Sequence, residues 1–217
     1  MAVIEGIQFL TQGLRNGVTV GAVWPSSKGL CRAMVAPVFE GTKGPLRVLE
    51  VGAGVGPVTS ELVERLLPGD TLDVVELNDR FCAILEKRFS GAPLPPRVHN
   101  ESILDFAPSY RFHHIISGLP LANFPAEMVE AIYAKFFRLL ELGGTLIMFQ
   151  HILAREVIST LGGPKNRSRA RALMAIEREL APLVVGERTV MLNMPPARVV
   201  VRRRPLLLED GSRKKAS

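Results

Sequence analysis

The chain alternates between short apolar runs and longer stretches in which apolar residues recur every three or four positions. The short runs predict buried strands and the longer stretches predict amphipathic helices. Strands are predicted over 47–52, 72–77, 97–100, 113–117, 145–150, 184–193 and 197–203. Helices are predicted from Ser26 or Ser27 to just before Pro37, from Pro57 to Leu66, from Asn78 or Asp79 to Phe89, and over 126–140 and 168–180. This alternation predicts an α/β protein with a mostly parallel sheet and helices on both faces.

The last two predicted strands are joined by a connection that is too short for a parallel crossover. Only residues 194–197 separate 190–193 from 198–201, so these segments should form an antiparallel hairpin. A parallel sheet that ends in such a hairpin resembles the Rossmann-like class I methyltransferases, whereas a dehydrogenase domain ends on a parallel sixth strand. We therefore predict a seven-stranded, mostly parallel sheet with a C-terminal antiparallel hairpin.

One α/β domain accounts for most of the 217 residues. We predict a helical segment over 1–40, which caps a ligand or contacts a membrane, a Rossmann-like domain over 41–206, and a basic tail over 207–217. No apolar run reaches the roughly 18 residues that span a bilayer, and the start of the chain lacks a signal-peptide pattern. Cys31 and Cys82 have no metal-ligand spacing and are predicted to be buried thiols in a reducing compartment, the cytoplasm.

Positive charge is concentrated in the last third of the chain. The net charge is +6 with a pI near 9.7, and residues 165–204 hold ten basic but only three acidic side chains. Such asymmetry favours an anionic partner, either nucleic acid or a membrane surface, although an ordinary solvated face explains it equally well.

A glycine-rich turn, Gly52-Ala-Gly54-Val-Gly56, follows the first predicted strand and opens a helix. Its spacing is one residue shorter than the dinucleotide-binding pattern, which suits a ligand without a pyrophosphate. Glu76 ends the second strand, 20 residues after the last glycine, where a carboxylate can accept hydrogen bonds from two ribose hydroxyls. Glu50 either faces the ligand's ammonium group or holds the turn. These residues form the predicted cofactor site.

Two more loops follow the third and fourth strands. Glu101 and the backbone N–H of Ser102 are predicted to contact an adenine ring, with a plain surface loop as the alternative. The fourth strand ends in Ser117-Gly-Leu-Pro-Leu121, and Ser117 is included in the predicted cofactor site. Enzymes that methylate the exocyclic nitrogens of bases commonly place Asn or Asp, then Pro and an aromatic residue there, and this chain has Leu121 instead of the aromatic.

Four segments together make the chain recognisable: 19–27 with Trp-Pro-Ser-Ser, 49–56 with the glycine turn, 117–125 with Leu-Pro-Leu-Ala-Asn-Phe-Pro, and 193–197 with Asn-Met-Pro-Pro-Ala. They resemble the bacterial phospholipid N-methyltransferases and the related ornithine-lipid N-methyltransferases, over residues 9 to 205. The resemblance implies methyl transfer from S-adenosyl-L-methionine to the amine headgroup of a membrane lipid, phosphatidylethanolamine or an ornithine lipid, in one or several rounds.

The attacking amine must lose a proton, and the predicted acceptors are His151, Tyr133, His113, His114 or water. Asn123 is predicted to orient the amine or, alternatively, to cap the following helix. No metal is expected.

A peripheral enzyme at the inner face of the membrane is expected, held by the N-terminal segment and by a basic loop with Arg167, Arg169 and Arg171. No nucleic-acid partner is expected. The alternatives are an enzyme that resembles the rRNA adenine N6-dimethyltransferases, and a non-catalytic module that binds lipid or RNA on the same fold.

Overall fold

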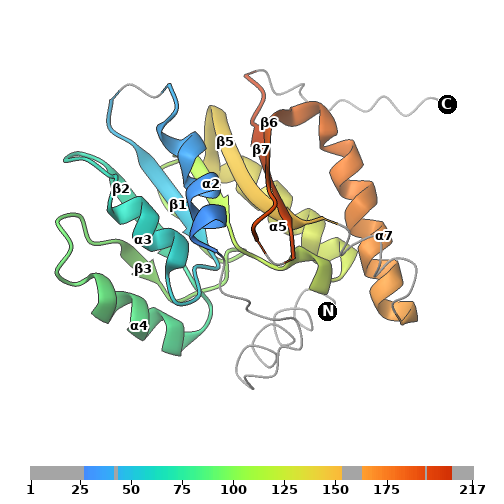
Figure 1. Ribbon diagram of the computed structural model, residues 1–217, viewed down its shortest axis with the longest axis horizontal. Helices are drawn as coiled ribbons and strands as arrows, with labels where there is room; N and C mark the ends of the chain where they lie inside the picture. The colour runs from blue at the N-terminus through green and yellow to red at the C-terminus, as the bar shows by residue number, and fades with distance from the viewer. Residues whose placement is uncertain (1–26, 42–43, 153–162, 194, 207–217) are drawn as a thin grey trace.

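A computed structural model describes residues 27–41, 44–152, 163–193 and 195–206, which form a seven-stranded sheet (Figure 1). The strand order is β3-β2-β1-β4-β5-β7-β6. The strands are β1 (Arg47–Val51), β2 (Thr71–Val75), β3 (Arg97–His99), β4 (Phe112–Ser117), β5 (Leu140–His151), β6 (Val184–Val190) and β7 (Ala197–Arg203). Strands β1 to β5 are parallel, and β7 runs antiparallel to both β5 and β6. The predicted fold and its terminal hairpin are confirmed.

Helices cover both faces of the sheet. One face carries α2 (Lys28–Phe39), α3 (Pro57–Val63) and α4 (Asp79–Phe89), and the other carries α5 (Ala126–Leu139) and α7 (Pro164–Glu179). The short 3-10 helices η1 (Leu121–Asn123) and η2 (Ala181–Leu183) precede α5 and β6. Alternate strand residues enter the two cores: Val74 packs under α3 and α4, and its neighbour Val75 packs on the α5 side. None of the helices in the described ranges is long and apolar enough to cross a membrane.

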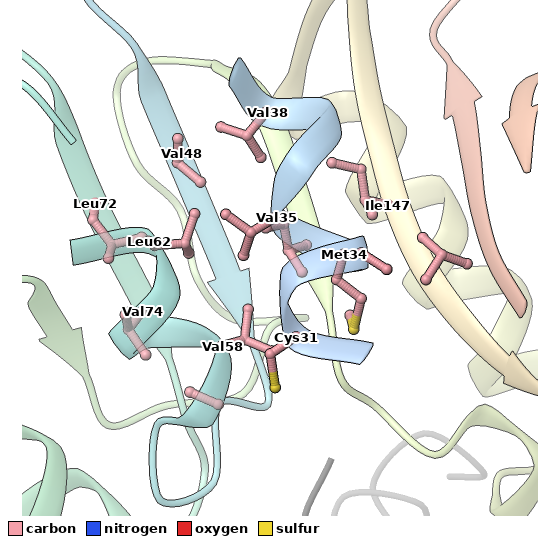
Figure 2. Packing of buried hydrophobic residues seen from close by; sticks show 14 of the residues in the cluster. Cys31, Met34, Val35, Val38, Val48, Val58, Leu62, Leu72, Val74 and Ile147 are labelled. Carbon is pink, nitrogen blue, oxygen red and sulfur yellow. The ribbon is translucent and has the colours of Figure 1, made fainter. Parts of the chain in front are cut away.

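Helix α2 begins where predicted but ends later. The Ser27 side chain caps it by accepting a 3.2 Å hydrogen bond from the N–H of Leu30. The helix then continues through Pro37 to Phe39, although we expected it to stop before the proline. Val38 explains the difference, because it is fully buried among the residues of the core in Figure 2, and this packing offsets the hydrogen bond that Pro37 cannot donate.

The bounds of β5 and β6 also differ from expectation. Strand β5 starts at Leu140 instead of 145, because the chain bulges between Leu140 and Thr145 opposite residues 112–114 of β4. Strand β6 ends at Val190 instead of 193, since the Asn193 side chain bonds to the start of α2 and leaves the ladder. The bounds of β7 are those predicted.

One sequence prediction is untested by the described residues, and another is wrong. The N-terminal segment before residue 27 and the tail after residue 206 lie outside the described residues, so the predicted three-part division stays a prediction. The basic stretch at 163–171 was expected to be a loop, but it forms the first turns of α7 from Pro164 onward, with Ala170 buried against the core side. Arg167, Arg169 and Arg171 are therefore helical residues.

Candidate active site

The carboxyl ends of β1, β2 and β4 meet at one edge of the sheet, where the glycine turn follows β1. The N–H of Gly52 donates to the carbonyl of Val75 at the end of β2, at 2.9 Å. The N–H of Gly118 donates to the carbonyl of Val51 at the end of β1, also at 2.9 Å. The turn is therefore fixed between its two neighbouring strands, at the edge where open parallel sheets bind ligands.

The three glycines of the turn have different surroundings, although all have a positive φ, at 73°, 57° and 84°. A Cβ on Gly52 would lie 2.8 Å from Leu119, and one on Gly56 would lie 2.8 Å from Leu85 and 3.0 Å from Phe89. A Cβ on Gly54 would meet nothing within 4 Å. The outer glycines are thus required by packing inside the protein, whereas Gly54 faces open space that a ligand can enter.

Glu76 lies directly at this turn, as predicted from its position after β2. Its Oε2 accepts a 2.9 Å hydrogen bond from the N–H of Gly54, and its Oε1 accepts one of 2.9 Å from the N–H of Asn78. The residue is 5% exposed. Each carboxylate oxygen has a second lone pair, so both oxygens can still accept from a ligand hydroxyl.

Glu50 lies beneath the turn and is 2% exposed. Its Oε2 accepts a 2.7 Å hydrogen bond from the hydroxyl of Thr59 on α3. The pKa of Glu50 is raised from 4.5 to about 7, mainly by burial; within this net value the Thr59 hydrogen bond lowers the pKa and the charge of Glu76 raises it. The bond between β1 and α3 supports the prediction that Glu50 holds the turn.

The loop after β3 contains a contact that the sequence did not reveal. The Asn100 side chain donates 3.1 Å hydrogen bonds to the carbonyls of Glu76 and Leu77, which fixes the backbone of the proposed ribose-binding residue. The two residues predicted to contact adenine, Glu101 and Ser102, come next in the chain. Ser102 is 7% exposed and its Oγ accepts from the N–H of Leu104 at 3.2 Å, while Glu101 is partly exposed beside it.

The loop after β4 packs tightly against the glycine turn. Ser117 is 1% exposed, and its Oγ accepts a 3.3 Å hydrogen bond from the N–H of Leu119. A Cβ on Gly118 would lie 2.7 Å from the carbonyl oxygen of Gly52, so glycine is required there. Leu121 and Phe124 are 5% and 4% exposed and belong to the core.

Two of the five predicted acceptor-site residues, Asn123 and His151, lie at this edge. Asn123 ends η1 and is exposed, and it does not cap α5, whose N-cap residue is Pro125. His151 ends β5 and is partly exposed, with its ring 5.3 Å from that of Phe149. Within the described part of the chain, its Nδ1 is buried without a hydrogen-bond partner.

Tyr133 is not brought to the edge. It lies in the middle of α5, 3% exposed, with the guanidinium of Arg202 5.9 Å from its ring centroid. Arg202 pairs with Leu146 of β5, two residues before Met148, which is level with the end of β4. The periodicity of α5 places Tyr133 on its buried face but does not give its height above the sheet, so the prediction of a proton acceptor here has no support in the geometry.

His113 and His114 lie at the opposite end of β4, away from the glycine turn. His113 Nδ1 accepts a 2.9 Å hydrogen bond from the N–H of Arg47. His114 Nδ1 lies 2.8 Å from the hydroxyl of Thr145, and burial lowers its pKa to about 4. Both line a cavity of about 560 Å³ between the end of α2 and strands β5 to β7, which is separate from the carboxyl edge.

The two cysteines are free and buried. Burial raises the pKa of both thiols to about 11, with smaller contributions from nearby carboxylates. Within the described ranges, no group of three or more His, Cys, Asp or Glu side chains is placed to hold a metal ion.

Known proteins match both the sequence and the fold. The model of the ribosomal RNA adenine dimethylase family matches residues 42–196. The ornithine lipid N-methyltransferase of Singulisphaera acidiphila is 27% identical over 143 residues, which cover 63% of this chain and 73% of the relative. The ribosomal RNA small subunit methyltransferase A of Dehalococcoides mccartyi is 28% identical over 116 residues, 53% of this chain and 38% of the relative. The chain therefore spans less than two thirds of that rRNA enzyme.

A solved structure shows the same fold. The N-methyltransferase NodS from Bradyrhizobium japonicum WM9, in complex with S-adenosyl-L-homocysteine, superimposes with a TM-score of 0.60 at 15% identity. The match covers 89% of this chain and 97% of that chain. At this identity the similarity establishes the architecture.

Proposed function

Because this chain belongs to the ribosomal RNA adenine dimethylase family and is an S-adenosylmethionine-dependent methyltransferase, we propose that its acceptor is the amine headgroup of a membrane lipid. The acceptor would be phosphatidylethanolamine or an ornithine lipid, methylated once or several times on the same nitrogen. The similarity to a relative named ornithine lipid N-methyltransferase supports this assignment, since the chain spans 73% of that protein.

The observation that carries the proposal is the loop after β4. A base stacks on an aromatic side chain for about 1–3 kcal/mol of affinity, and its amino group needs an amide or carboxylate oxygen beside it. Here the first position is the buried hydroxyl of Ser117, and Leu121 of the core takes the place of the aromatic residue. The one aromatic residue in 118–124, Phe124, is itself buried. This loop suits a small aliphatic amine better than a base.

The residues at the glycine turn fit the cofactor. Open space beside Gly54 leaves room for a nucleoside, and the Glu76 carboxylate has free lone pairs for its ribose hydroxyls. Gly52, Gly56 and Ser117 shape the turn, and Glu50 supports it from below. We assign the adenine contact to Glu101 and Ser102. When bound, S-adenosylmethionine supplies a methyl group on a positively charged sulfur.

The acceptor side needs a free lone pair on nitrogen. An alkyl amine is protonated at neutral pH, so a proton must leave before the nitrogen attacks. His151 is our candidate for the group that accepts it, because it ends β5 at the same edge and is partly exposed there. The exposed Asn123 can accept a hydrogen bond from the amine and orient it. Positioning of the two reactants supplies most of the acceleration.

Methyl transfer to vesicles tests the proposal. Purified protein is incubated with methyl-labelled S-adenosylmethionine and vesicles that contain phosphatidylethanolamine or an ornithine lipid, and the lipid extract is resolved by thin-layer chromatography. We expect label in mono-, di- or trimethylated lipid, and none with a Glu76→Ala variant. An absence of label from every aminolipid would overturn the proposal.

A second acceptor class has support of its own. The matching family model carries the name of an RNA-modifying activity, and residues 165–204 are strongly basic. In a parallel reaction of the same assay, protein-free small-subunit ribosomal RNA replaces the vesicles. Label in adenine of the RNA, and not in lipid, would establish this alternative.

A further inference from the structure

The turn between β6 and β7 exposes two adjacent apolar side chains. Leu192 is 94% exposed and Met191 is 68% exposed. Val190, just before them, pairs with Ala197, which in turn pairs with His151 at the end of β5. The turn therefore projects from the same edge of the sheet as the glycine turn and the candidate acceptor site.

The turn is held outward by buried polar contacts. Asn193 is 4% exposed, its Oδ1 accepts a 3.2 Å hydrogen bond from the N–H of Ser27, and its Nδ2 donates a 2.7 Å bond to the carbonyl of Pro195. These bonds tie the base of the turn to the start of α2. The two exposed side chains precede Asn193 in this turn, so the fold itself holds them in contact with water.

Cations surround the base of this turn. A groove of about 610 Å³ runs between α2 and β6, and Met191 and Leu192 line it together with Arg32, Arg65 and Arg188. One carboxylate, Glu61, lies 3.4 Å from both Arg32 and Arg65, so the groove keeps a net positive charge. An apolar tip beside cations is complementary to an interface where acyl chains lie under anionic headgroups.

We infer that the β6–β7 turn is an interfacial anchor: Met191 and Leu192 enter the surface of an anionic bilayer, while Arg32, Arg65 and Arg188 face its phosphates. This placement turns the carboxyl edge of the sheet, with His151 and Asn123, toward the lipid. The inference rests on the proposed function, because an enzyme that methylates a membrane lipid must bind the membrane. Its test, however, measures membrane binding, which does not require that any lipid be methylated.

Sedimentation with vesicles tests the anchor. The full chain is mixed with vesicles of phosphatidylcholine that contain phosphatidylglycerol, and the bound fraction is measured. We expect the double variant Met191→Ser, Leu192→Ser to bind at least about tenfold more weakly, since two exposed apolar side chains no longer leave water when the turn enters the bilayer. The matched control is Leu206→Ser, which removes a 71% exposed leucine at the opposite edge and should bind as the wild type does.

A fluorescent reporter gives an independent readout. Tryptophan emission of Leu192→Trp should shift to shorter wavelength with the anionic vesicles, and that of Leu206→Trp should not. Equal vesicle affinities for the double variant and the control would overturn the anchor. A normal anchor result together with no lipid methylation would leave the inference standing and reject only the proposed acceptor.

Discussion

The backbone N–H of Ser27 donates a 3.2 Å hydrogen bond to Oδ1 of Asn193, which lies 166 residues further along the chain. Ser27 caps α2 with its own side chain, and Asn193 holds the β6–β7 turn through Pro195. The two residues belong to two of the sequence segments by which the chain resembles lipid N-methyltransferases. The hydrogen bond between them joins two segments that lie far apart in the sequence.

Asn193→Ala should therefore destabilise the protein. The substitution removes two partly buried hydrogen bonds, each of which contributes about 0.5–1.5 kcal/mol to the free energy of unfolding. Urea unfolding followed by circular dichroism measures the change. The control is Asn166→Ala on the exposed side of α7, which should stay within about 0.5 kcal/mol of the wild type. Equal effects of the two substitutions would contradict the structural role of Asn193.

Gly54→Val and Glu76→Gln should each weaken the binding of S-adenosyl-L-homocysteine at least about tenfold. At Gly54, φ is 57° and a side chain would occupy the open space of the turn. At Glu76, the amide replaces an acceptor that serves two backbone N–H groups and, by our proposal, two hydroxyls. Isothermal titration calorimetry measures both affinities. Glu86→Gln on the exposed side of α4 is the control and should bind normally; unchanged affinity in both test variants would show that the ligand binds elsewhere.

Glu50→Gln should stabilise the protein at alkaline pH. The pKa of Glu50 is raised to about 7 from 4.5, so the folded state binds more protons than the unfolded state between these values. The stability of the wild type therefore falls as pH rises from about 4.5 to about 7. Glutamine cannot ionise, and the variant should gain at most about 3 kcal/mol over the wild type at pH 8 but little at pH 5. Urea unfolding at the two pH values checks this, and a gain that does not depend on pH would refute it.

His151→Asn should reduce kcat by about a hundredfold at neutral pH, the lower end of what general-base catalysis contributes. The affinity for S-adenosyl-L-homocysteine should not change. If His151 accepts the proton of the amine, the rates of variant and wild type should converge at high pH, where the amine is already neutral in solution. A constant ratio of rates from pH 7 to pH 10 would show that the histidine only supports the structure.

Replacing Arg167, Arg169 and Arg171 together by Gln should weaken binding to anionic vesicles by about tenfold or more. These residues start α7, which follows β5 at the carboxyl edge, and each cation near an anionic surface contributes about 1 kcal/mol. The difference from the wild type should shrink as salt is raised, because exposed charges are screened. Sedimentation with vesicles at two salt concentrations measures it.

The charge-matched control removes three exposed arginines away from this edge: Arg111, Arg138 and Arg203. If the control loses as much vesicle binding as the test variant, net charge alone determines binding and the start of α7 has no special place in it.

Much of the fold follows from the sequence because it depends on local patterns. Buried strands appear as apolar runs, and a four-residue connection permits only a hairpin. The meeting of the glycine turn and Glu76 was also predictable, since the carboxyl ends of adjacent parallel strands always share one edge. The structure agrees with that rule: β1 and β2 are neighbours in the sheet, and Glu76 at the end of β2 accepts a hydrogen bond from Gly54 in the turn after β1.

Other features depend on packing between distant segments, which no local pattern contains. The end of α2 is decided by Val38 in the core and not by Pro37. The hydrogen bonds from Asn100 to the carbonyls of Glu76 and Leu77 depend on the register of two strands and on the path of the loop after β3, which cannot be read from the sequence. Tyr133 was predicted as a possible proton acceptor, but its buried place in the middle of α5 and its contact with Arg202 depend on how far the helix is shifted along the sheet.

The carboxylate of Glu76 is already fixed by two main-chain N–H groups before any nucleoside arrives. The carboxylate is therefore a preorganised acceptor, and both hydroxyls of a ribose can donate to it without any rearrangement of the turn. A deoxyribose analogue would leave one fixed oxygen without its partner and with no freedom to turn elsewhere. If the ribose binds Glu76 as we propose, the fold selects against deoxynucleosides through the two backbone N–H groups that hold the carboxylate.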